Sequence, residues 1–130
     1  MTPENLTEAV SILASNVVSD PRWNGEADDL GVSILGMILY GYSLATGRIA
    51  MMLDVEHIDR AVHQAITTHV GSAEKWTEGL VEEAQKSSLN PEYHAGQYEL
   101  VGVGHSYFWI EDMTAVTDNI FQNIKAFRSV

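Results

Sequence analysis

The sequence predicts an all-α fold, a compact bundle of about five to six helices around an apolar central helix at about residues 28–46. Apolar residues recur three or four positions apart along most of the chain, which is the spacing of one helix face. Residues that start and end helices, mainly Asp, Ser, Pro and Gly, stand between these periodic segments. Because no linker or internal repeat interrupts the 130 residues, we expect a single helical domain over residues 1–130.

The N-terminal segment predicts a helix over residues 3–19. Thr2 can cap this helix and Pro3 suits its first position. Apolar residues then follow at helical spacing, at Leu6, Val10, Leu13 and Val17. A loop rich in Asp, Pro, Asn and Gly follows at residues 20–25.

The central helix is predicted to begin near Glu26 and to end at residues 46–47, where Thr-Gly is a stop signal. Arg48 is the one charged residue between Leu30 and Leu53. A membrane span needs about 20 apolar residues, and the uncharged stretch from Leu30 to Gly47 is a little shorter and contains several glycines and hydroxyl residues. We therefore expect no membrane contact and a buried central helix, with glycines that let other helices approach closely.

Two further helices are predicted at residues 55–70 and 73–88. Asp54 can cap the first of them and Gly71 can end it. Ser72 can cap the second. The short connection between them predicts that these helices pack as neighbours.

The C-terminal third is less regular. Residues 90–92, Asn-Pro-Glu, have the composition of a helix start. Residues 98–110 combine aromatic residues and valine with Gly102 and Gly104, which is compatible with a short irregular helix or with a small hairpin. The helical spacing returns over residues 111–127.

Composition limits the function. Eighteen acidic residues against seven basic ones give a net charge of −11, which disfavours binding to nucleic acid or anionic lipid and favours a basic protein partner. The absence of cysteine excludes disulfides and zinc–thiolate sites. The N-terminal residues do not have the pattern of a secretory signal, so we expect a cytoplasmic protein.

The histidines do not form a metal-binding motif. His57, His63 and His69 recur every six residues, and successive side chains therefore point about 240° apart around a helix. Asp59 and His63 are four residues apart and share a face. The sequence also contains no nucleophile or phosphate-binding motif. We expect no catalytic residues, metal or cofactor, with a helical metal-binding protein or enzyme that uses Asp59 and His63 as the alternative.

Acidic residues concentrate at three places. Glu74, Glu78 and Glu82 recur every four residues with Glu83 beside them, although like charges at this spacing destabilise a helix. The other two groups lie at helix starts: Asp54, Glu56 and Asp59, and Glu26, Asp28 and Asp29. We expect the group at residues 74–83 and the group at residues 54–59 to bind the partner, with Tyr107 and Trp109 as aromatic anchors.

This combination of small size, acidity and helical content resembles that of bacterial immunity proteins, which bind and neutralise a cognate toxin. The resemblance implies a non-catalytic cytoplasmic inhibitor that occludes a basic toxin domain, of the nuclease type. Three alternatives remain: the metal-binding protein or enzyme, a phage-type acidic mimic of nucleic acid, and a self-associating subunit that forms a homodimer through the helix at residues 30–45.

Overall fold

The computed structural model describes residues 2–129 and confirms the all-α fold. Helical residues make up 82% of the structure, and the described residues contain no strand. The six α-helices are α1 (Pro3–Val18), α2 (Asp29–Ala45), α3 (Val55–His69), α4 (Glu74–Leu89), α5 (Ala95–Ser106) and α6 (Met113–Arg128). Three short helical turns join them: η1 (Pro21–Gly25), η2 (Thr46–Ala50) and η3 (Tyr107–Trp109).

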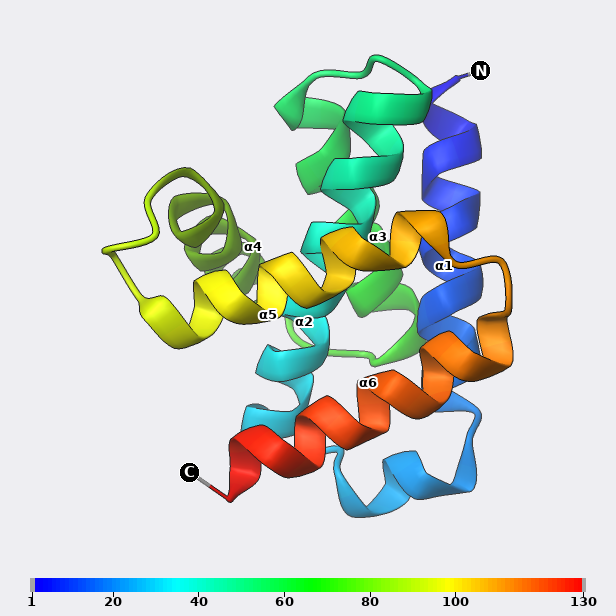
Figure 1. Cartoon of the computed structure of the whole chain (residues 1–130), viewed down its shortest axis with the longest axis vertical. Coiled ribbons are helices and arrows are strands. Elements are labelled where there is room, and N and C mark those ends of the chain that lie inside the picture. The colour runs from blue at the N-terminus through cyan, green and yellow to red at the C-terminus, as the bar shows by residue number, and fades with distance from the viewer. Residues whose placement is uncertain (1, 130) are drawn as a thin grey trace.

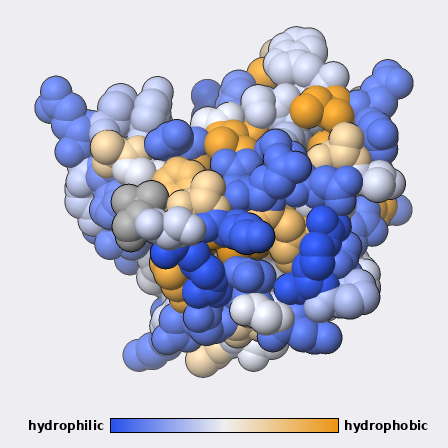
Figure 2. Space-filling view, turned by 60° about the horizontal axis from the view of Figure 1, so that its bottom comes forward, coloured by the Kyte–Doolittle hydropathy of each residue, from blue (hydrophilic) through white to orange (hydrophobic). Residues whose placement is uncertain are grey.

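The helices are arranged around α2. Helices α1, α2 and α3 run along the long axis of the molecule, α5 and α6 cross in front of them, and α4 lies at one side (Figure 1). Helix α2 contacts all five other helices, most extensively α5. The face at the lower end of the molecule is mostly hydrophilic, with apolar residues exposed in separate places (Figure 2).

Helix α2 is the core of the bundle. Its fully buried side chains include Leu35, Ile38 and Leu39. The apolar stretch Asp29–Ala50 is long and hydrophobic enough to cross a membrane, because an 18-residue window within it has a mean hydropathy of 1.4. However, 72% of that window is buried inside the molecule. Among the large apolar residues of α2 itself, Leu30 at its start is exposed.

Glycines allow the close packing of α2 against α5. A Cβ on Gly41 of α2 would lie 1.8 Å from the carbonyl oxygen of Val101, and a Cβ on Gly104 of α5 would lie 1.8 Å from that of Ile38. Neither position can hold a larger residue without separating the two helices. The expectation of close helix approach at the glycines of the central helix is thus confirmed.

Asp side chains cap several helices. Asp54 caps α3, as predicted, and accepts a hydrogen bond from the backbone N–H of His57. Asp28 caps α2 and accepts from Gly31, so this helix begins at Asp29, three residues after the predicted start. Ser72 does not cap α4, since the capping residue is Ala73 and forms no side-chain bond.

Gly71 ends α3 with a φ of +80°, as predicted. Helix α2 ends at Ala45 with Thr46 as its C-cap, close to the predicted end, but Gly47 does not take a positive φ. The chain continues through η2 as a π-helical turn. Gly47 is instead a packing position, where a Cβ would lie about 3 Å from side-chain atoms of Ile58 and Leu6. The reversal is made by Met52, which takes a left-handed φ of 55°.

Residues 98–110 form a helix and a short turn, so the hairpin interpretation is wrong. Helix α5 covers Ala95–Ser106 and leads into η3. Residues 90–92 do not start this helix, because the Asn90 side chain accepts from the Glu92 N–H in a local turn. The cap is His94, whose ring nitrogen accepts from the Gln97 N–H. Glycine and β-branched residues had made this segment ambiguous.

Candidate functional site

Helix α4 carries the acidic ridge on the side of the molecule. Its inward face buries Leu80, Val81 and Ala84 against α2, α3 and α5. Glu74, Glu78 and Glu82 are exposed. The four-residue spacing therefore places these carboxylates on solvent, as predicted.

An open groove of about 470 Å³ separates α4 from α3. Asp59 and His63 line it from α3, and Glu78 and Glu82 line it from α4. Arg60, Val81 and Gln85 complete the lining. The structure thus brings one member of the α3 acidic group together with two members of the α4 ridge.

Asp59 is the most enclosed acid of this groove. The hydroxyl of Tyr40, a buried residue of α2, donates a hydrogen bond of 2.7 Å to Asp59 Oδ1. Partial burial raises the pKa of the Asp59 carboxyl, and the hydrogen bond from Tyr40 lowers it in part. Burial and the neighbouring carboxyl hold the pKa of Tyr40 far above its usual range, so Tyr40 remains the donor at neutral pH.

The carboxylates of this groove form no ion pair with Arg60, although Arg60 lines the groove. Among the ion pairs of residues 2–129, none includes Asp59, Glu78 or Glu82. Arg60, the one Lys or Arg of the lining, pairs with Glu56 at 3.4 Å instead. We call these three acids, with His63, the acidic groove. Its charge is available to an incoming Lys or Arg side chain.

The other predicted acidic residues serve local roles or lie elsewhere. Asp54 is 2.7 Å from His57 Nδ1 at the start of α3. Glu56 forms the exposed pair with Arg60. Glu83 is half-buried and lines a second groove on the opposite flank of α4. The group at Glu26, Asp28 and Asp29 does not join the acidic groove, because Glu26 and Asp28 bind Arg128 of α6.

The two predicted aromatic anchors differ in accessibility. Tyr107 is 2% exposed, and its hydroxyl donates to Asn119 Oδ1 at 2.6 Å, so it is a core residue and its assignment as an anchor is wrong. Trp109 is 73% exposed and packs edge-on against Phe108. It lies between α5 and α6, outside both α4 grooves.

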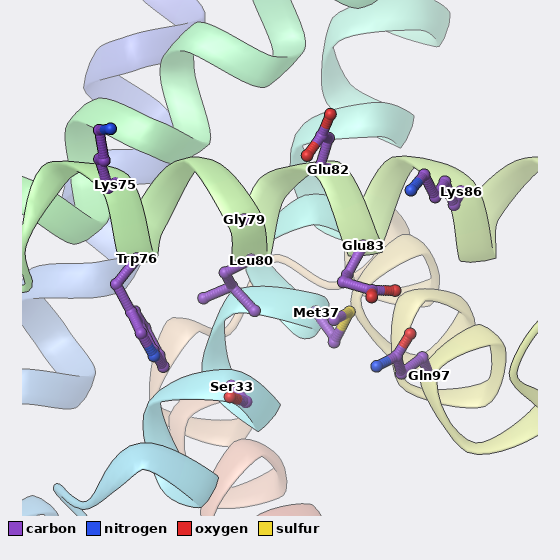
Figure 3. Close-up of a pocket in the computed structure, with 10 residues that line it drawn as sticks. All are labelled: Ser33, Met37, Lys75, Trp76, Gly79, Leu80, Glu82, Glu83, Lys86 and Gln97. Carbon is purple, nitrogen blue, oxygen red and sulfur yellow. The ribbon is translucent and has the colours of Figure 1, made fainter.

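The second groove contains an exposed aromatic residue, Trp76. Trp76 shares a face with Leu80 and Ala84 by spacing, but it is 36% exposed. Its ring extends from α4 towards Ser33 of α2 (Figure 3). Trp76 lies in the first turn of α4, next to the fully buried Thr77.

The histidines form no metal centre in the described part of the chain. No group of three or more His, Asp or Glu side chains within residues 2–129 is arranged to hold a metal ion. Asp59 and His63 do line the same groove. His69 is 2.5 Å from the hydroxyl of Ser11 and joins α3 to α1.

Comparison of the chain with protein-family models, with curated proteins and with solved structures finds no match. The geometry of the acidic groove is therefore the basis for the assignment that follows.

Proposed function

We propose that this protein is a non-catalytic inhibitor that binds a basic protein, and specifically an immunity protein that neutralises a cognate bacterial toxin of the nuclease type in the cytoplasm. The observation that carries this proposal is the acidic groove. Two helices contribute three carboxylates to it, and none of the three has an ion-pair partner within residues 2–129.

The physical argument concerns the cost of this arrangement. Partial burial of Asp59 disfavours its charged form, and Glu78 and Glu82 repel each other along α4. A guanidinium or ammonium group in the groove offsets both effects, because it supplies the missing positive charge. The Lys and Arg residues with which a nuclease holds its substrate have this chemistry, and covering them blocks substrate binding.

Charge also favours fast association. A net charge of −11 attracts a basic partner over a distance, and carboxylates at the contact orient its approach. For an inhibitor of a toxin, the association rate determines how long the free toxin acts.

The test compares two charge-reversal variants on the partner captured from a native lysate. The first carries Glu74→Lys, Glu78→Lys and Glu82→Lys. The second carries Glu8→Lys, Glu99→Lys and Glu111→Lys, which are exposed on other helices or loops and change the net charge equally. We expect the first variant to associate about tenfold or more slowly in stopped-flow measurements at low salt, with a smaller difference at high salt.

The association rate of the matched variant should fall only by the amount that the change in net charge causes. Equal rates for the two variants would exclude α4 as the contact surface. A captured partner without a basic surface would overturn the proposed function itself.

A further inference from the structure

The second groove, on the opposite flank of α4, has an apolar floor. Met37 of α2 and Leu80 of α4 form this floor, and Trp76 forms one wall (Figure 3). Its volume is about 420 Å³. The charged side chains of the lining are two lysines and two glutamates, Lys75, Lys86, Glu82 and Glu83, so the groove is close to neutral.

Gly79 lies on α4 at the edge of this groove, and the fold does not explain it. A Cβ on Gly79 would meet no atom within 4 Å. By contrast, a Cβ on Gly36 would lie 2.5 Å from Leu80, and Gly41 and Gly104 are fixed by the α2–α5 contact. A glycine inside a helix costs about 0.5–1 kcal/mol relative to alanine. At Gly79 this cost brings no packing benefit within the described chain.

The α4 backbone at Gly79 is therefore open to close approach by another molecule. Helices approach glycine more closely than any other residue, as Gly41 and Gly104 show within this fold. Glu82 lines both this groove and the acidic groove. A partner that pairs with Glu82 from one flank is thus adjacent to the apolar floor on the other.

We propose that the second groove holds the apolar face of a basic amphipathic helix that belongs to the partner. The Lys or Arg side chains of this helix lie over the acidic groove. This inference rests on the proposed function, because the positive charges of the helix are attracted by Asp59, Glu78 and Glu82. The apolar face matches the floor of Met37 and Leu80, and Trp76 is the type of residue that anchors such contacts. The net neutrality of the groove excludes charge as the reason for binding at this flank.

Two synthetic peptides of equal length and equal lysine content test the inference. The first places leucine on one face of a lysine-rich helix, and the second has glutamine in place of every leucine. We expect fluorescence anisotropy to show that the leucine peptide binds the wild-type chain at least tenfold more tightly. Gly79→Trp, which fills the groove, should remove this difference, whereas Gly102→Trp on the exposed side of α5 should leave it unchanged.

A smaller substitution guards against a folding defect in Gly79→Trp. Gly79→Ala adds one methyl group in open space, so the variant should retain the helical circular dichroism spectrum. Its affinity for the leucine peptide should fall by a few-fold, while its affinity for the glutamine peptide should not change. Equal binding of the two peptides, or wild-type affinity in Gly79→Trp, would overturn the inference and leave the proposed function standing. If neither peptide binds, the inference also fails, whereas the proposed function is decided separately by whether the captured partner has a basic surface.

Discussion

Asp59 is the residue at which stability and the proposed partner binding oppose each other. Its carboxylate is half-buried between α3 and α4, and Tyr40 supplies one hydrogen bond. Because its pKa is raised in the folded chain, folding favours the protonated form. The stability that Asp59 contributes is therefore present below about pH 4, the ordinary pKa of an aspartate. It is lost as the pH rises through the folded pKa.

Replacement of Asp59 by asparagine separates the effect of the Asp59 charge on stability from its effect on partner binding. An asparagine oxygen can still accept the Tyr40 hydrogen bond, while the desolvated charge is removed. We expect Asp59→Asn to increase the free energy of unfolding at pH 7 slightly and to weaken binding of the basic partner several-fold. Urea denaturation and isothermal titration calorimetry measure the two effects.

Glu99→Gln is the control for Asp59→Asn. Glu99 is exposed on α5 and lies outside both α4 grooves. The Glu99→Gln variant should leave partner binding unchanged. A loss of stability in Asp59→Asn would mean that its ionised form is already compensated, and would remove the main energetic argument for the site.

At the scale of elements, the crossing of α2 and α5 determines the architecture. The backbones meet at Gly41 and Gly104, both buried, and a side chain at either position would contact a carbonyl oxygen of the other helix. Helix α5 in turn forms one side of the groove beside α4. The shape of that groove therefore depends on how closely α5 approaches α2.

Substitution at this crossing should have a large effect on stability. Gly104→Ala places a Cβ 1.8 Å from the Ile38 carbonyl oxygen, and we expect it to lower the free energy of unfolding by about 1–3 kcal/mol or more. Gly102→Ala is the matched control two residues away, where the Cβ meets nothing within 4 Å. It should raise stability by up to about 1 kcal/mol. Equal effects in chemical denaturation would refute the tight crossing.

The same helix shows where prediction from sequence fails. Helices α1, α3 and α6 are clear from apolar spacing, and Asp54 and Gly71 mark both ends of α3. Helix α5 is not clear, because Gly104 faces α2 while Gly102 faces solvent, and two glycines with different roles look alike in the sequence. Nothing local shows that Gly104 is required by a helix about 60 positions earlier in the chain.

At the scale of the whole molecule, two arginines connect α6 to the segment between α1 and α2. Arg22 binds Asp118 of α6 at 2.9 Å and lies over the ring of Phe121. Arg128 of α6 binds Glu26 and Asp28. In a chain with 18 acidic residues, these contacts use two of the seven basic residues to hold the C-terminal helix in place.

These contacts predict how the protein responds to acid. Arg128 and the Gly31 N–H hold the pKa of Asp28 at about 2, well below the value of about 3.9 for an unfolded aspartate. Its contribution to stability is therefore present above about pH 4 and is lost as the pH falls towards 2. Asp28→Asn retains a helix cap but not the charge, so its melting temperature should depend less on pH across this window. An unchanged dependence would contradict the assigned ion pair.

The candidate site could be predicted from the sequence only in part, because its residues come together through the packing of the whole fold. The glutamates of α4 and the shared face of Asp59 and His63 follow from four-residue spacing alone. Their convergence in one groove does not, because it depends on how α3 and α4 pack after the turn at Gly71. Tyr107 was misassigned for a related reason, since its partner Asn119 lies on another helix. Trp76 was missed because spacing identifies a helix face and not how completely that face is covered.

The connections of α6 also set an order for folding. Arg22 and Asp118 are 96 positions apart, and Arg128 is 102 positions from Glu26. Forming these contacts closes a loop of most of the chain, and the entropy that this costs exceeds that of the short loops between consecutive helices. We therefore expect α6 to dock last, after α2 has already been enclosed by α1, α3 and α5. Pulsed hydrogen exchange during refolding would show this as late protection of the α6 amides.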